Sequence, residues 1–212
     1  MASLQVAVLL SGSGTTLENL FEKREAGRLS VDIVAVLSSR ADAYGLERAR
    51  RRGVPALTAE RRRFLSTEEF SQAVFGAIAP YKPDLICLAG FMSRLRIPRE
   101  YEGRIVNVHP ALLPAFGGKG LYGHHVHEAV LRAGCKLTGC TVHFVDNEYD
   151  HGPIIAQKEV PVLQDDTADT LAARVQAAER DIYPKAIQLY AEGRLRVEKG
   201  IVKFVTFGEE AG

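Results

Sequence analysis

Val6-Ala7-Val8-Leu9-Leu10-Ser11-Gly12-Ser13-Gly14-Thr15-Thr16-Leu17 is the stretch that decides the fold of this 212-residue chain. The run Val6–Leu10 is continuously apolar, which is typical of a strand buried on both faces. The small residues after it lead directly into a helical pattern from about Thr16 to Ala26. A strand, a glycine-rich turn and a helix in this order form the opening unit of a parallel α/β sheet.

The same alternation continues along the first half of the chain. Further apolar strands are predicted at Val31–Leu37, Pro55–Leu57, Leu85–Ala89 and Ile105–Val108, and helices at 43–52 and 67–79. The second of these helices begins with Ser66 as N-cap and with Glu69 completing a capping box. Buried strands separated by helices predict an α/β fold with a Rossmann-like, mostly parallel, doubly wound sheet.

The pattern changes in the C-terminal half. Two strands, Thr138–Val145 and Ile154–Val162, are separated only by a loop, so we expect an antiparallel pair there. A long helix is predicted at 168–191, and Pro184 should kink or split it. Its apolar face comprises Leu171, Val175, Ala178, Ile182 and Leu189. Two short strands, 194–198 and 201–206, are expected to meet at Lys199-Gly200.

Composition narrows the class of protein. The chain is 46% hydrophobic and 25% charged, with 27 basic and 26 acidic side chains. With charges so nearly balanced, the protein as a whole has no electrostatic attraction to nucleic acid or to a membrane surface. No stretch approaches a membrane span, and the first ten residues resemble a strand more than a signal peptide. Three cysteines without a CxxC pair indicate reduced, buried thiols of a cytoplasmic protein.

The turn Ser11–Thr16 is a candidate phosphate site. Small residues allow a ligand to approach the backbone, and a helix start offers N–H groups and a positive dipole end. Thr15 and Glu18 are expected to form a capping box there. A dinucleotide site fits poorly, because Leu17 stands where the third glycine of that motif belongs. The alternative is an ordinary capped strand-to-helix turn.

Asn107 and His109 form the second candidate site. They lie two residues apart at the end of a buried strand, so their side chains share one face. Open α/β sheets bind ligands at the carboxyl ends of their strands. An amide donor beside an imidazole is suited to stabilising an oxyanion and transferring a proton. A strand-ending turn with a structural histidine is the alternative.

Three weaker features complete the set. The loop Asp146–Pro153 holds carboxylates that could keep a histidine protonated, or it is a solvated turn. Glu179 lies beside the apolar face of the long helix, where a glutamate is usually only solvated. The histidines at 124, 125, 127, 143 and 151 match no familiar zinc spacing, so no metal is expected.

Several stretches carry a resemblance that spans nearly the whole chain in order. They are Leu10–Leu17, Ala41–Ala49, Leu88–Met92, Val106–Pro114, Thr141–Val145, Tyr149–Ile155 and Arg174–Pro184. At these residues the chain resembles the folate-dependent glycinamide ribonucleotide formyltransferases of the purine pathway. The N-x-H-P-x-L-L-P and D-x-G-P stretches are shared by formyl-folate enzymes generally. The S-G-S-G-T-T start and Glu179 indicate the glycinamide ribonucleotide branch.

The resemblance implies direct transfer of a formyl group from 10-formyltetrahydrofolate to the amine of glycinamide ribonucleotide. It implies one formyltransferase domain over 1–212, with a phosphate-binding half at 1–105 and a catalytic and folate-binding half at 106–212. The ribonucleotide would be held by Gly14, Thr15, Thr16, Gln176 and Glu179. The partners would be small molecules, with no nucleic acid or membrane, and a homodimer is left open.

The resemblance also assigns the chemistry. Asn107, His109 and Asp150 would be the catalytic trio, with Asp150 keeping His109 charged. Folate would be bound by Met92, Ser93, Arg94, Leu95, Asn107 and the main chain around Asp146. The folate would serve as formyl donor, without a metal. Related folate hydrolases and tRNA formyltransferases share the trio, so the trio does not distinguish them. Glu179 favours the glycinamide ribonucleotide transferase.

The chain departs from the expected pattern in three places. Thr67 stands where an arginine touching the folate is expected, and Ser93 looks inserted. The segment Phe116–His127 is longer than the common form and rich in glycine, which suggests a mobile flap over the site. A nucleotide-binding sensor or a metal-dependent hydrolase on the same fold also stays open, because fold alone does not settle function.

Overall fold

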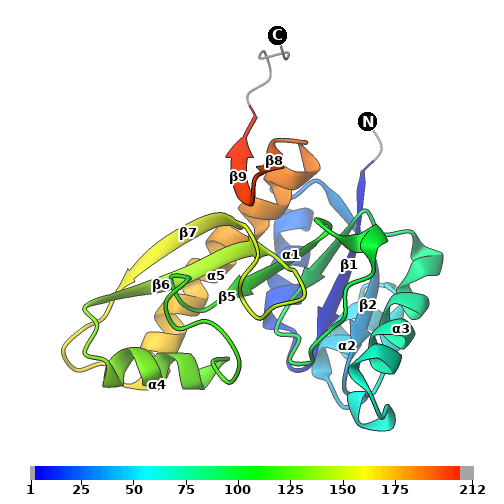
Figure 1. Ribbon diagram of the computed structural model, residues 1–212. Helices are drawn as coiled ribbons and strands as arrows, with labels where there is room; N and C mark the ends of the chain where they lie inside the picture. Colours follow the sequence, from blue (N-terminus) through cyan, green and yellow to red (C-terminus); the bar gives the residue numbers. More distant parts are fainter. Residues whose placement is uncertain (1–2, 206–212) are drawn as a thin grey trace. The chain divides into compact units, whose positions relative to one another are not determined.

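A computed structural model describes residues 3–205 of the chain (Figure 1). The chain divides into two compact units, one ending at Asn107 and the other beginning at Val108. One sheet has seven strands in the order β3-β2-β1-β4-β5-β6-β7, and a separate sheet pairs β8 with β9. The predicted α/β class with a mostly parallel, Rossmann-like sheet is confirmed.

Strands and helices alternate through the first unit, as the sequence predicts. The elements are β1 (Leu4–Leu10), α1 (Thr15–Glu25), β2 (Val31–Ser38), α2 (Tyr44–Arg51), β3 (Ala56–Thr58), α3 (Thr67–Ile78), β4 (Leu85–Leu88) and β5 (Ile105–His109), whose last two residues belong to the second unit. Three short 3-10 turns lie at Arg61–Arg63, Ala79–Tyr81 and Arg99–Tyr101. Strand β1 pairs in parallel with β2 and β4, and the pairs β2–β3 and β4–β5 are parallel as well.

The core of this unit is centred on β1. Residues Val6–Leu10 expose at most 1% of their surface, because strands flank β1 and helices cover the sheet. Helix α2 packs on β2 and β3, and α3 packs on β2 (Figure 1). Ser66 caps α3 as predicted, its hydroxyl accepting from the Glu69 amide at 3.0 Å. The Glu69 carboxylate binds the amide of Leu65 instead of closing the box on Ser66.

The second unit has a different construction. It contains α4 (His124–Arg132), β6 (Leu137–Phe144), β7 (Ile154–Pro161), α5 (Ala168–Ala191), β8 (Leu195–Glu198) and β9 (Ile201–Phe204). The predicted antiparallel pair is confirmed as β6–β7. The hairpin β8–β9 turns at Lys199-Gly200, both with positive φ, as a two-residue hairpin turn requires. Residue 206 of the predicted last strand lies outside the described residues.

Helix α5 runs without interruption across Pro184, so of the two predicted outcomes, a kink or a split, the split is wrong. Thr167 and Thr170 form a capping box at its start, which the sequence reading missed. The helix packs on β6 and β7 through its predicted apolar face. Four of the five predicted residues of that face are buried, and Leu189 is half-buried.

Candidate active site

The turn between β1 and α1 leaves the start of the helix without a side-chain cap. Gly14 is the N-cap residue, in the left-handed region with φ of 73°, and no side chain caps the helix. The predicted Thr15–Glu18 capping box is therefore wrong. The Glu18 carboxylate accepts hydrogen bonds from Arg48, at 2.6 Å, and from Arg52. Burial raises the pKa of Glu18, but the two arginines outweigh it and hold this pKa below its ordinary value.

Two glycines allow the turn to meet helix α2 closely. A Cβ atom on Gly14 would lie 2.6 Å from the Cα of Gly45, which itself lies at the start of α2. The Gly45 amide donates to the Gly12 carbonyl at 3.1 Å. The Arg48 guanidinium donates to the Ser13 carbonyl at 2.9 Å. Helix α2 therefore fixes the shape of the turn, so that the first amides of α1 keep a defined direction.

Ser11 links the carboxyl ends of three neighbouring strands. Its hydroxyl lies 2.6 Å from that of Ser39 and accepts from the Met92 amide at 2.9 Å. Its own amide donates to the Gly90 carbonyl at 3.1 Å. The segment predicted to bind folate is thereby anchored at Met92. This role of Ser11 was missed in the sequence reading, although Ser11 ends the first strand.

The segment after Met92 presents its residues unequally. Met92 and Arg94 are exposed, and Ser93 is half-buried. Leu95 exposes 8% of its surface, so it packs inward. Only the first three of these predicted folate residues offer accessible side chains. Thr67, where a folate-binding arginine was expected, begins α3 and its carbonyl accepts from the hydroxyl of Ser71.

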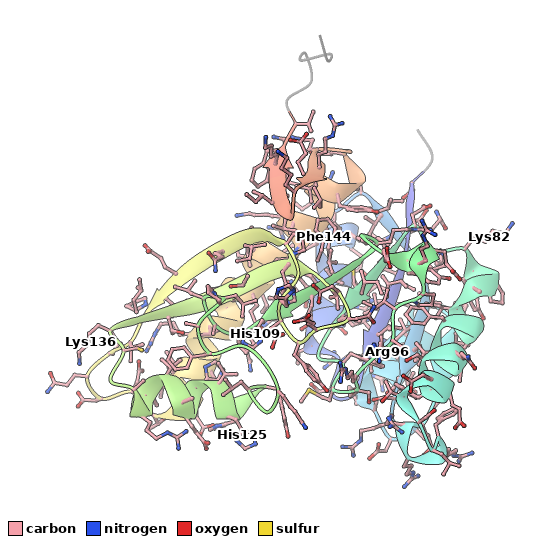
Figure 2. The ribbon with its side chains drawn as sticks, viewed as in Figure 1. Lys82, Arg96, His109, His125, Lys136 and Phe144 are labelled. Carbon is pink, nitrogen blue, oxygen red and sulfur yellow. The ribbon has the colours of Figure 1, made fainter. Side chains whose placement is uncertain are left out.

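His109 and Asp150 come together as the sequence predicts. His109 ends β5 and exposes 3% of its surface, and Figure 2 labels it within the fold. Its Nδ1 lies 3.5 Å from Oδ1 of Asp150. Its Nε2 donates to the Phe116 carbonyl at 2.8 Å. Asn107 precedes His109 by two residues in β5, so strand alternation places both side chains on one face.

A second histidine faces the same carboxylate. Nδ1 of His143 donates to the Phe144 carbonyl at 2.8 Å. The other ring nitrogen, Nε2, lies 3.8 Å from Oδ1 of Asp150. Burial lowers the pKa of His143, which favours the neutral ring. The sequence reading gave His143 no role, although it stands near the end of β6, directly before the Asp146–Pro153 loop.

The Asp146–Pro153 loop places Asp150 by local hydrogen bonds. The Asp146 carboxylate accepts from the Glu148 amide and from Nδ1 of His151, both at 2.8 Å. The hydrogen bond to Asp146 raises the pKa of His151 above its ordinary value. Asp150 has a φ of 52°, unusual for a residue with a side chain, and its Oδ2 accepts from the Gly118 amide at 2.9 Å. The loop is thus exposed at Glu148, Tyr149 and His151, as a solvated turn would be, but its Asp150 carboxylate is directed toward His109, as the other alternative expected.

The loop and the segment after β5 enclose a pocket of about 300 Å³. Its lining comprises Leu113, Pro114, Gly117, Gly118, Glu148, Tyr149, Asp150, His151, Gly152 and Ile154. Three glycines in this lining leave main-chain groups uncovered by side chains, and Asp150 adds a carboxylate. A pocket of this composition can bind a flat, polar ring through main-chain hydrogen bonds.

Glu179 is the most perturbed carboxyl group of the second unit. It lies half-buried on α5, and it forms no hydrogen bond or ion pair with any residue in the range 3–205. Burial raises the pKa of Glu179 to about 8. Gln176, one turn earlier on α5, is exposed. A carboxyl group without a partner in a sheltered position is suited to receiving a cationic or hydrogen-bond-donating ligand.

The remaining histidines do not gather. His124 pairs with Asp169 at 3.0 Å and His125 lies on the outer side of α4 (Figure 2). His127 exposes 3% of its surface, and its Nδ1 has no hydrogen-bond partner among the described residues. Over residues 3–205, no group of three or more His, Cys, Asp or Glu side chains is arranged to hold a metal ion. No helix in that range is long and apolar enough to cross a membrane.

Comparison with known proteins places the chain in a family. Residues 4–187 match the family model described as formyl transferase. The chain is 43% identical to the trifunctional purine biosynthetic protein adenosine-3 of Gallus gallus over 196 residues, covering 92% of this chain but only 19% of that protein. It is 39% identical to the phosphoribosylglycinamide formyltransferase of Escherichia coli, covering 92% of this chain and 91% of that protein.

Solved structures agree with the sequence comparison. The glycinamide ribonucleotide transformylase 1 of Symbiobacterium toebii superposes with a TM-score of 0.90 and 44% identity, covering 96% of this chain and 95% of that one. A formyltetrahydrofolate deformylase of Pseudomonas syringae has a TM-score of 0.86 at 23% identity, a likeness of fold alone. By the family model and by these relatives, the chain belongs to the formyl transferase family.

Proposed function

We propose that this protein transfers the formyl group of 10-formyltetrahydrofolate to the amine of glycinamide ribonucleotide, a step of de novo purine synthesis in the cytoplasm. The observation that carries the proposal is the pairing of buried His109, at the end of β5, with half-buried Asp150, 3.5 Å away. The two substrates are small molecules, and the proposed reaction uses neither a metal nor a nucleic acid.

The phosphate of the ribonucleotide binds at Gly14, Thr15 and Thr16 in this proposal. Support comes from the start of α1, where no side chain caps the helix. The first amides of the helix can therefore donate to a ligand. An anion there also interacts favourably with the helix dipole. Contacts with α2, rather than the side chains of the turn, hold the turn in place, so the phosphate binds to a main chain that is already fixed in shape.

Glu179 receives the glycinamide amine, and Gln176 lies near the ribose end. A carboxyl group whose pKa is raised to about 8 by burial exchanges a proton readily at neutral pH. An ammonium group that enters the site supplies the counter-charge that Glu179 lacks among the described residues. The carboxylate takes one proton from the ammonium group and becomes neutral, and the amine that results keeps a lone pair for attack.

The folate binds to Met92, Ser93, Arg94 and Leu95, to Asn107, and to the main chain around Asp146. The accessible side chains of Met92 and Arg94 support this, whereas the inward packing of Leu95 restricts it to shaping the segment. The pocket beside Asp150 has main-chain groups suited to a pterin. No arginine stands at Thr67, so the tail of the folate is held without that contact.

The proposed reaction uses these groups as follows. The amine nitrogen attacks the formyl carbon, and the bond from that carbon to N10 of the folate breaks. Asn107 and protonated His109 stabilise the oxyanion of the tetrahedral intermediate. Asp150 stabilises the charge on His109 and helps to pass the proton lost by the amine to N10. Alignment of the two substrates supplies a large share of the acceleration.

The experiment is an absorbance assay of 10-formyltetrahydrofolate loss, with and without glycinamide ribonucleotide. Turnover only with the ribonucleotide supports the transferase. Turnover without it indicates a hydrolase, absence of turnover indicates a nucleotide-binding sensor, and loss on chelation indicates a metal enzyme. His109→Ala should lower kcat about a hundred- to a thousandfold. The exposed His125→Ala on α4 is the matched control and should keep full activity.

A further inference from the structure

The short segment after β5 contributes a main-chain carbonyl to the catalytic histidine. The Phe116 carbonyl lies 2.8 Å from Nε2 of His109. A carbonyl oxygen carries no proton, so Nε2 must be the nitrogen that donates. Nδ1 is then left facing Oδ1 of Asp150 at 3.5 Å, longer than a strong charge-assisted hydrogen bond. Nδ1 is therefore the ring nitrogen that a reacting oxygen could use, because Nε2 is already bound to Phe116.

Two residues later, the same segment contributes an amide to Asp150. The Gly118 N–H donates to Oδ2 at 2.9 Å, which turns the other oxygen, Oδ1, toward His109 and His143. One carbonyl and one amide of a three-residue segment therefore hold both members of the catalytic pair. Phe116 and Asp150 both have positive φ, at 55° and 52°, which is the backbone conformation that brings the segment and the loop together.

We propose that the main chain of residues 116–118 positions the catalytic pair, so that in the protonated ring of His109 Nε2 stays bound to Phe116 and Nδ1 is the nitrogen that donates to the reacting oxygen. Phe116 fixes the proton on Nε2, and Gly118 fixes the direction of the carboxylate. This inference rests on the proposed function for the chemical roles of His109 and Asp150. Gly117 is the positioning residue that permits the close approach.

The space around Gly117 explains why a glycine stands there. A Cβ atom at this position would lie 2.6 Å from Cδ2 of Leu113 and 3.2 Å from Cβ of Asp150. Leu113 cannot easily yield, because it is 5% exposed and its amide and carbonyl are bonded to Thr141 and Gln157. An added methyl group therefore pushes the segment away from Asp150. Gly117 has an ordinary φ, so this contact is the main cost of the substitution.

Gly117→Ala is the first test. We expect kcat to fall about tenfold to a hundredfold while both KM values stay within about twofold, because the reacting groups shift by a fraction of an ångström. At a pH high enough to keep the ring neutral, the ¹⁵N spectrum of His109 should change from the Nε2-protonated tautomer to a mixture of both tautomers. Gly76→Ala, in open space on α3, is the matched control and should leave kcat and the His109 spectrum unchanged. Unchanged kcat and an unchanged spectrum in Gly117→Ala would overturn the proposal.

A measurement on the unmodified protein covers the case in which Gly117→Ala does not fold. The Gly118 amide proton should depend on the protonation of Asp150, to whose Oδ2 it donates and whose Oδ1 faces the titratable rings of His109 and His143. That dependence should disappear in Asp150→Asn. A flat Gly118 signal across the titration sinks the inference. If the protein transfers no formyl group, the proposed function fails, while the two spectra still decide the positioning role.

Discussion

Two glycine-containing segments, the turn 11–16 and the segment 113–118, follow buried strands and offer main-chain groups rather than side chains. In the turn, no side chain caps the amides at the start of α1. In the second segment, the Phe116 carbonyl and the Gly118 amide are already bonded to His109 and Asp150. The first segment is prepared for a ligand, whereas the second serves the protein's own side chains. Glycine is required in both, for different reasons.

Asp150→Asn gives the largest effect of the variants that compare the two segments, and it tests the second segment. The asparagine oxygen can still accept from Gly118, but its NH₂ group then faces Nδ1 of His109 and the negative charge is lost. We expect kcat to fall about a hundredfold, with ribonucleotide affinity nearly unchanged. Steady-state kinetics and direct binding measure the two quantities. A variant that lost ribonucleotide affinity but kept its turnover would contradict the assigned role.

Gly14→Ala tests the first segment. The new Cβ would lie 2.6 Å from the Gly45 backbone, at a position with φ of 73°. Destabilisation of about 1–3 kcal/mol is expected from the strained conformation, together with a raised KM for the ribonucleotide and a smaller change in kcat. Gly12→Ala, which meets nothing within 4 Å, is the control for adding a methyl group to this turn. Denaturant unfolding and kinetics report both effects, and an equal loss in the control would remove the argument.

The fold was predictable from the sequence because buried strands have an unambiguous pattern. The parallel strands and the β6–β7 pair appear where apolar runs predict them, within one or two residues. The caps were less predictable: Glu18 binds Arg48 and Arg52, residues distant in sequence, instead of its own helix. Pro184 is accommodated within a continuous α5 packed on β6 and β7. Tertiary contacts thus outweighed local preference at both places.

The sequence was sufficient to predict which residues form the candidate site, but not which groups they would contact. Asn107 and His109 stand out because polar residues end an apolar strand, and the resemblance pointed to Asp150. Nothing in the sequence indicates that the Phe116 carbonyl binds His109, because main-chain groups are the same in every residue. His143 was missed for a related reason. Its role depends on its side chain facing Asp150 at the end of β6, and the sequence does not give that direction.

Glu179→Gln has a moderate effect that appears in the pH dependence of stability. Burial raises the pKa of Glu179 from 4.5 to about 8. A raised acid contributes stability that is fully present below pH 4.5 and is lost as the pH rises through about 8. The unmodified protein without ligand should therefore lose stability across this window, and Glu179→Gln should flatten the slope. Bound ribonucleotide should reduce this loss of stability in the unmodified protein but not in Glu179→Gln, because its amine pairs with the ionised carboxylate of Glu179. Equal slopes in the two proteins would show that Glu179 ionises normally.

His151→Asn gives the smallest expected effect and separates two ways of holding Asp150. The His151–Asp146 pair lies in the same loop as Asp150, but the His151 side chain is 66% exposed, and water screens an exposed pair. The hydrogen bond to Asp146 raises the pKa of His151, so the pair stabilises the loop below the ordinary histidine value and loses this contribution as the pH rises through the raised one. If the Gly118 amide holds the carboxylate, kcat at pH 8 should stay within about twofold of the unmodified protein, since exposed pairs contribute little. A large loss of kcat, with the Gly118 amide signal unchanged, would assign the positioning of Asp150 to its own loop rather than to the segment after β5.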